Sequence, residues 1–86
     1  MLAFILVKIE SGKDREIVSR IIDLGIKKVY PTYGVYDLVM EIEFTKAKEL
    51  DDFVFNKIRR IKGVTETVTM IVSEMLMWEM GLSSNT

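Results

Sequence analysis

The sequence predicts an α+β domain with the ferredoxin-like order βαββαβ, in which one antiparallel four-stranded sheet carries two helices on one face. Two observations predict this fold. Segments with extended and helical apolar spacing follow one another in that order, and two halves of similar length end alike, in Ile22–Val29 and Ile61–Val68. The 86 residues suffice for one small domain.

The first half begins with an apolar, β-branched stretch at Ala3–Ile9, which predicts a central strand. Ser11–Asp14 then has the S-x-x-D pattern of a capped helix start. Gly25 is positioned to end the helix that follows. Its apolar stripe consists of Ile17, Val18, Ile21, Ile22 and Leu24.

Two extended segments occupy the middle of the chain. Ile26–Thr32 contains Pro31, which has no backbone N–H to donate, and this indicates an edge strand or its end. Leu38–Phe44 alternates between apolar and polar residues, which is typical of a strand with one buried face. That face is expected to hold Leu38, Met40, Ile42 and Phe44.

The last predicted elements are a second helix and a final strand. The helix runs from about Lys46 to Ile61, with Thr45 as its cap and Gly63 after its end. Its apolar stripe consists of Leu50, Phe53, Val54, Ile58 and Ile61. The strand Val64–Ser73 alternates, with Thr65, Thr67 and Thr69 on one face and Val64, Val68, Met70 and Val72 on the other.

Composition limits the function. The 12 basic and 13 acidic side chains are interleaved, which predicts no direct nucleic-acid or membrane partner. The absence of cysteine and histidine excludes disulfides, thiol nucleophiles, Cys/His zinc sites and histidine bases, so we expect no metal and no cofactor. The apolar opening lacks a basic leader region and stops at Lys8, too early to span a bilayer, which is compatible with a cytoplasmic protein.

The chain is richer in apolar residues than so small an interior requires, since 49 % of its residues are hydrophobic. We therefore expect a homodimer in which two uncovered sheet faces pack together. The C-terminal segment 75–86 is set apart from the domain at 1–74. Glu74–Leu82 holds three of the six methionines and Trp78. This segment is predicted to cover apolar surface on a neighbouring subunit or, alternatively, to bind a ligand. Residues 83–86 are expected to fray.

Two motifs carry a family resemblance. Gly34–Val39 (GVYDLV) and Gly63–Val72 (GVTETVTMIV) resemble the G-x-Y-D-L and G-V-x-x-T-x-T patterns of the ligand-binding, or RAM, domain of Lrp/AsnC transcription regulators. The likeness covers Ala3 to about Glu74. Because those regulators carry an N-terminal helix-turn-helix and this sequence begins at the first strand, it resembles a stand-alone RAM protein.

The resemblance implies a dimer built on the open sheet faces, an octamer or similar ring of dimers, and amino-acid effectors bound between dimers. Because the charge pattern disfavours direct DNA binding, any effect on transcription would have to pass through a full-length regulator with which the chain co-assembles, and this is a hypothesis. Carried onto this sequence, the resemblance predicts ligand contacts from Tyr33, Gly34, Val35, Tyr36, Asp37, Thr67 and Thr69. Two positions depart from the family, because Tyr33 replaces a residue that is often small and hydroxylated and Val35 one that is often polar.

The chemistry of the loop agrees with an amino-acid site. A zwitterion needs an anion for its ammonium and donors for its carboxylate, which Asp37 and backbone N–H groups near Gly34 can supply. Alternatively, Asp37 accepts hydrogen bonds from its own turn, the tyrosines pack at an interface, and the threonines form a solvated face.

Other functions fit less well. A small ferredoxin-like enzyme would need catalytic groups, but the sequence offers neither histidine nor a glycine-rich phosphate cradle, so we expect no catalysis. An RNA-binding module would need aromatic and basic residues on the open face, where Glu41 and Glu43 would repel phosphate. The expected function is amino-acid binding and oligomerisation in transcription regulation, and a pure assembly scaffold without ligand is the alternative.

Overall fold

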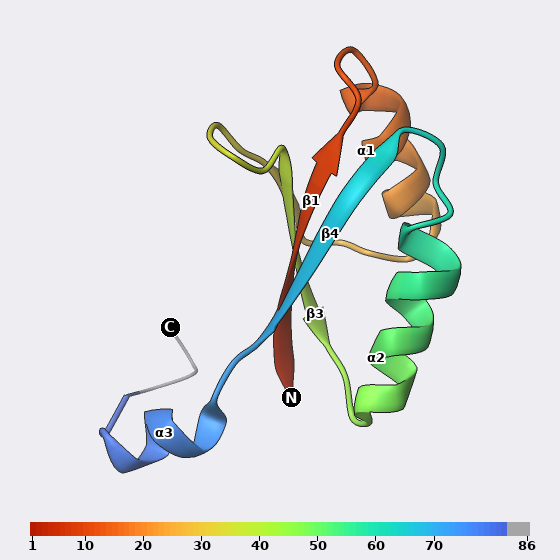
Figure 1. Cartoon of the computed structure of the whole chain (residues 1–86). Coiled ribbons are helices and arrows are strands. Elements are labelled where there is room, and N and C mark those ends of the chain that lie inside the picture. The colour runs from red at the N-terminus through yellow and green to blue at the C-terminus, as the bar shows by residue number, and fades with distance from the viewer. Residues whose placement is uncertain (83–86) are drawn as a thin grey trace.

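The computed structural model describes residues 1–82 and shows one four-stranded sheet with α1 and α2 packed on one face (Figure 1). The strand order is β2-β3-β1-β4 and every neighbouring pair is antiparallel. This confirms the predicted ferredoxin-like fold. The elements are β1 (Leu2–Ile9), α1 (Asp14–Asp23), β2 (Val29–Pro31), β3 (Leu38–Glu43), α2 (Ala47–Phe53), the π-helix η1 (Val54–Ile58), β4 (Val64–Ile71) and α3 (Glu74–Glu79).

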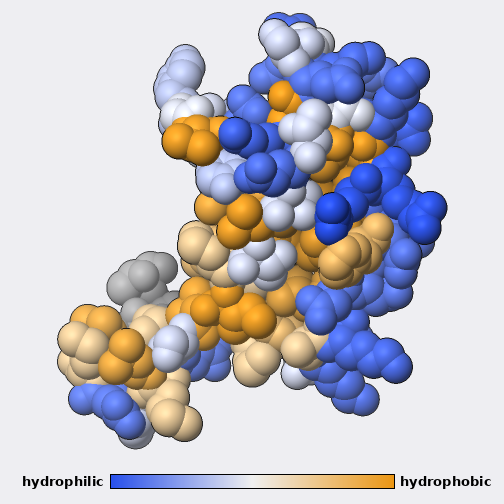
Figure 2. Space-filling view, viewed as in Figure 1, coloured by the Kyte–Doolittle hydropathy of each residue, from blue (hydrophilic) through white to orange (hydrophobic). Residues whose placement is uncertain are grey.

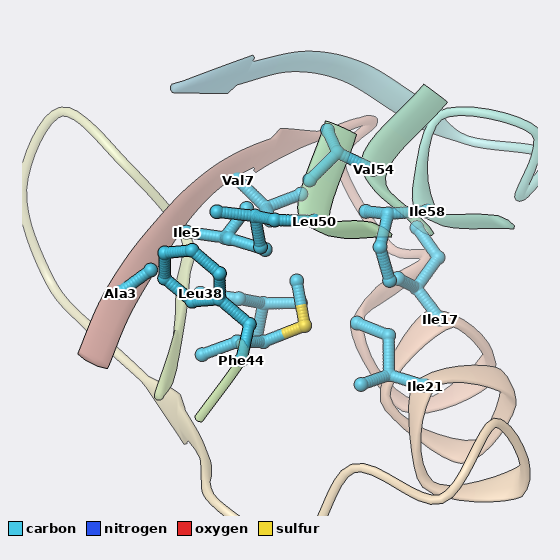
Figure 3. Close-up of a cluster of buried hydrophobic side chains, with 11 residues drawn as sticks. Ala3, Ile5, Val7, Ile17, Ile21, Leu38, Phe44, Leu50, Val54 and Ile58 are labelled. Carbon is cyan, nitrogen blue, oxygen red and sulfur yellow. The ribbon is translucent and has the colours of Figure 1, made fainter. Parts of the chain in front are cut away.

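The core lies between the helices and the sheet, as the alternation of β1 and β3 requires. Ala3, Ile5 and Val7 of β1 are fully buried, and Leu38 and Met40 of β3 lie beside them. Figure 3 shows these side chains meeting the inner faces of α1 and α2. Each large apolar side chain buried in this way contributes about 1.5–3 kcal/mol.

Both predicted helix caps are wrong. The N-cap residues are Lys13 and Lys46, and neither makes a side-chain capping hydrogen bond. A turn in which the Lys13 N–H donates to the Glu10 carbonyl at 3.2 Å takes up the Ser11 region, so α1 begins after it. The Thr45 hydroxyl donates to the Glu49 carboxylate at 3.4 Å and makes no capping hydrogen bond to a backbone N–H of α2.

The second helix ends earlier than predicted because its hydrogen bonding changes. After Phe53 the chain continues as η1, and the Arg59 N–H donates to the Val54 carbonyl at 2.9 Å, a π-type bond. The turn that follows needs a glycine. Gly63 has φ +101°, and a Cβ there would lie 2.9 Å from Cδ1 of Ile17.

The two edge strands differ from the prediction in detail. β2 is confirmed as an edge strand, but it keeps only three residues. In β4, Lys8 pairs with Glu66 and Ile9 pairs with Val64, so Thr65 forms a β-bulge. The bulge moves Val64 to the helix side, where it packs against the core, instead of onto the predicted face.

The face of the sheet opposite α1 and α2, here called the open face, is apolar in its centre. Register places Leu6 of β1 between Val39 of β3 and Val68 of β4, and it places Phe4 between Glu41 of β3 and Met70 of β4. The open face thus includes Phe4, Leu6, Val39, Val68 and Met70. Figure 2 shows apolar surface continuing from the sheet onto α3, which has no buried residue. No helix within 1–82 has the length and apolarity to cross a membrane.

Candidate ligand site at the β2–β3 loop

The loop between β2 and β3 is held in shape at its base. The backbone N–H of Thr32 donates to the Asp37 carbonyl at 2.9 Å, and the Thr32 hydroxyl donates to the Tyr36 carbonyl at 2.8 Å. Gly34 at the tip has φ +126°, a conformation that favours glycine. Tyr33 and Val35 flank it and are exposed. The base is therefore ordered by hydrogen bonds while the tip points two apolar side chains into solvent.

Asp37 joins the loop to β1. Its backbone N–H donates to the Val7 carbonyl at 2.9 Å, and its Oδ2 accepts a hydrogen bond from the Ile9 N–H at 2.8 Å. The carboxylate thus accepts the hydrogen bond that a backbone carbonyl of a paired strand would accept, at a position just before β3 begins. The Asp37 carboxylate therefore accepts its hydrogen bond from β1, whereas its own loop contacts only the Asp37 carbonyl. Within residues 1–82, Oδ1 has no hydrogen-bond donor.

Three more polar side chains gather beside Asp37. The Tyr36 hydroxyl donates to Oε2 of Glu66 at 3.0 Å, and Nζ of Lys8 lies 6.0 Å from the centre of the Tyr36 ring. Register places Glu66 directly across from Lys8. We call Lys8, Tyr36, Asp37 and Glu66 the Lys8 cluster. It occupies the end of the open face where β1 ends and β4 begins.

The charges of the Lys8 cluster are not neutralised internally. Among the described residues, Lys8 makes no ion pair within 4.0 Å, although it has acids on both neighbouring segments. The hydrogen bond to the Glu66 carboxylate raises the pKa of Tyr36 above its ordinary 10.0, and partial burial and the negative charge act in the same direction. Tyr36 therefore stays neutral at physiological pH.

The predicted contact residues do not all come together. Tyr36 and Asp37 lie in the Lys8 cluster, whereas Thr67 and Thr69 pair with Val7 and Ile5 and so lie on the helix side of the sheet. Lys8 and Glu66 were not predicted as site residues. The sequence offered a signal for Glu66, because it lies inside the GVTETVT motif and alternates with Val68 and Met70, but only the pairing of β4 with β1 places it directly across from Lys8.

The cluster presents groups that complement a zwitterion. Lys8 offers a cation for a carboxylate, Asp37 Oδ1 and Glu66 offer acceptors for an ammonium, and the Tyr36 ring offers apolar surface. These groups are exposed or half-buried. One copy of the chain therefore forms an open half-site, which a second surface would have to cover before charge interactions became strong.

Comparison with known proteins places this geometry in a family. The model of the Lrp/AsnC ligand-binding domain matches residues 2–81. The HTH-type transcriptional regulator FL11 of Pyrococcus furiosus is 41 % identical over 73 residues, which cover 84 % of this chain and 48 % of that protein. The chain thus spans about half the length of this curated relative.

Solved structures agree with the fold. The crystal structure of FFRP-DM1 superposes with a TM-score of 0.76 and 38 % identity, covering 83 % of this chain and 96 % of that one. The transcriptional regulator NMB0573 of Neisseria meningitidis, solved as a complex with L-Met, shares the fold with a TM-score of 0.71 and 23 % identity, covering 86 % of this chain and 51 % of that one.

Proposed function

Because this chain belongs to the Lrp/AsnC ligand-binding domain family, we propose that it binds a free amino acid at the Lys8 cluster. The single observation that supports the proposal most is the charge arrangement: Lys8, which makes no ion pair within residues 1–82, lies across from Glu66 and over the Tyr36 ring, while Asp37 binds the next residue of β1, Ile9. One small zwitterion satisfies all of these groups at once. The L-Met complex of NMB0573 shows that a protein with this fold binds an amino acid.

In the proposed complex, each part of the ligand has a partner. The α-ammonium donates to Oδ1 of Asp37, the oxygen that the Ile9 N–H leaves free, and to Glu66. The α-carboxylate accepts from Lys8 and from backbone N–H groups of the loop at Gly34. The side chain lies on Tyr36. Thr67 and Thr69 lie on the helix side of the sheet. They could contact the ligand only if it extended around the edge strand β4.

We further propose that the chain acts as a dimer through its open face. Phe4, Leu6 and Val68 form adjoining apolar surface there that residues 1–82 leave uncovered. Packing this face against a second copy removes apolar area from water. Dimers then assemble into an octamer or similar ring in which a neighbouring copy covers the exposed Tyr33 and Val35.

A ligand held between two dimers stabilises the ring by mass action, which couples amino-acid concentration to assembly without any chemical step. In transcription regulation this chain would act by co-assembling with full-length regulators such as those it resembles. The Tyr36 hydroxyl donates to the Glu66 carboxylate, but this contact raises the pKa of the phenol and so favours its neutral form, and the proposed function is binding and not catalysis.

The test measures amino-acid binding by isothermal titration calorimetry on the wild-type chain and on Lys8→Gln, which removes the cation and keeps much of the stem. We expect one or a few of the twenty amino acids to bind, and Lys8→Gln to weaken binding about tenfold or more, as for a lost charge-assisted hydrogen bond.

Asp37 needs a paired comparison because it also has a structural contact. In Asp37→Asn the amide oxygen can still accept from the Ile9 N–H, so the fold is kept while the negative charge is lost; Asp37→Ala loses both. Loss of binding in folded Asp37→Asn supports the site. Binding that is unchanged in both Lys8→Gln and Asp37→Asn excludes the site, and a stable assembly that binds none of the twenty supports the scaffold alternative.

A further inference from the structure

The C-terminal segment Ser73–Leu82, here called the tail, lies outside the packed domain. It leaves the sheet after the Val72 N–H donates to the Leu2 carbonyl at 2.9 Å, and α3 then projects away on the open-face side (Figure 1). Its Trp78 is 86 % exposed and its Met75 is 75 % exposed. The tail also carries Glu74 and Glu79 and no basic residue. It is therefore an acidic, largely apolar segment in which α3 has no buried residue.

A groove of complementary character lies on the other side of the molecule, between α1 and η1. Its volume is about 420 Å³, enough for an indole ring with space to spare, and Ile17, Leu24 and Ile61 supply apolar lining. Four basic side chains surround it, Arg20, Lys57, Arg60 and Lys62, against two acids, Glu16 and Asp23. Within residues 1–82, none of these four basic groups makes an ion pair.

The charge of two other grooves disfavours the tail. The groove beside β2 is lined by Asp14, Asp23 and one basic residue, Arg15. The groove below α2 is lined by Glu43 and Glu49 without a basic residue. A tail with two glutamates would be repelled from both, whereas the α1–η1 groove attracts it.

A tail cannot reach the groove of its own chain. Ile61 and Lys62 of the groove are separated from β4 only by Gly63, and the eight residues of β4 carry the chain about 26 Å away at 3.3 Å per residue. Fully extended, residues 72–78 would span about 25 Å, so they would barely return along β4 and could not also pass around the sheet. A tail that docks in this groove must therefore belong to another molecule.

We propose that the tail of one copy docks in the α1–η1 groove of a second copy, with Trp78 seated on the apolar lining and Glu74 and Glu79 facing Lys57 and Arg60. The contact joins two different surfaces, so it is heterologous and builds rings or chains of copies. It involves neither the open face nor the Lys8 cluster, and so it goes beyond the proposed function. Trp is the residue type that most often anchors such contacts.

Charge reversal tests both halves of the contact. One variant carries Lys57→Glu with Arg60→Glu in the groove, and the other carries Glu74→Lys with Glu79→Lys in the tail. Multi-angle light scattering after size exclusion should show wild-type particles larger than a dimer, and each variant alone should lose about half of that mass or more. An equal mixture should recover it, because the acidic groove then accepts the basic tail and the basic groove accepts the acidic tail.

Matched controls separate docking from net charge and from folding. Lys46→Glu with Lys48→Glu makes the same charge change as the groove variant, but at residues that do not line the groove, and should keep the wild-type mass. Trp78→Ala should lower the mass while leaving thermal unfolding of the domain unchanged, since the side chain is exposed. Lys8→Gln measured without amino acid should keep the wild-type mass while it loses amino-acid binding, whereas the charge-reversed variants lose mass at once, so the two proposals fail separately.

Several outcomes would overturn the inference. One is a wild-type chain that stays at dimer mass or below at every concentration. Another is a groove variant with wild-type mass, which would show that the tail docks elsewhere even if the tail variant dissociates. A third is a mixture that fails to recover the mass lost in the two variants, because reciprocal charges would then not determine the contact.

Discussion

The two faces of the sheet have the same apolar alternation but different surroundings. On the helix side, Ile5 and Val7 of β1 are fully buried beneath α1 and α2. On the open face, Leu6 between them is half-buried, and Met70 of β4 remains 49 % exposed. Alternate residues of one strand therefore have different roles. Those on the helix side stabilise the domain, and those on the open face are available for association.

This difference explains how so small a chain can have a folded core and still carry apolar residues on its surface. The core needs only one face of the sheet, because two helices suffice to cover it. The Lys8 cluster lies at the edge of the open face, where a second copy of the chain would enclose it. The following experiments test whether the helix side determines stability while the open face determines association.

The largest effect is expected from paired truncations on β1. Ile5→Ala should lower the free energy of unfolding by about 2–5 kcal/mol, because it leaves a cavity in the core. Leu6→Ala should cost the isolated domain less than half as much, but it should reduce the dependence of unfolding on protein concentration. Urea unfolding at several concentrations measures both. Equal costs that are independent of concentration would contradict the separation.

A smaller effect is expected from two glycines that both have positive φ. Gly34→Ala should cost about 1 kcal/mol for its backbone alone, since nothing lies within 4 Å of a Cβ there. Gly63→Ala has a similar backbone cost and also meets Cδ1 of Ile17 at 2.9 Å, so it should cost about 1–3 kcal/mol more. Thermal unfolding compares them. If Gly34→Ala proved the more harmful, the loop and not the helix side would be the tightly constrained region.

The smallest effect concerns ionisation on the open face. The pKa of Tyr36 is raised by its hydrogen bond to Glu66, so the neutral phenol is favoured in the folded state. Any stability from this bond is present below the ordinary tyrosine pKa of 10.0 and is lost as the pH rises through the raised value. Ultraviolet titration should show one tyrosine ionising later than the others. Glu66→Gln should bring that titration earlier, and Tyr36→Phe should remove it.

Periodicity predicted most of the fold, because burial of alternating or helically spaced side chains is a property of local sequence. Leu38, Met40, Ile17 and Ile21 are all buried as their spacing indicated. Helix starts were predicted less well. Ser11 and Thr45 have the right chemistry for caps, but the neighbouring turns place other residues, Lys13 and Lys46, at the cap positions.

The candidate site was predicted only in part. The sequence identified Asp37 and Tyr36 from a short motif whose residues stay adjacent whatever the fold does. It could not identify Lys8 and Glu66, which come from strands nearly sixty residues apart in the chain and meet only through sheet pairing. The bulge at Thr65 changes the face of Val64 alone, and no local pattern signals it.

By itself, the sequence determined the order of elements, the apolar side of each, the family and the loop that carries the acid, because these depend on spacing and residue type within short segments. The tertiary structure decided which side chains of β4 face the loop, that Asp37 binds β1, and that the groove between α1 and η1 is beyond the reach of its own tail. The physical reason is register: a shift of one residue exchanges the two faces of a strand, and register is set by pairing between distant segments.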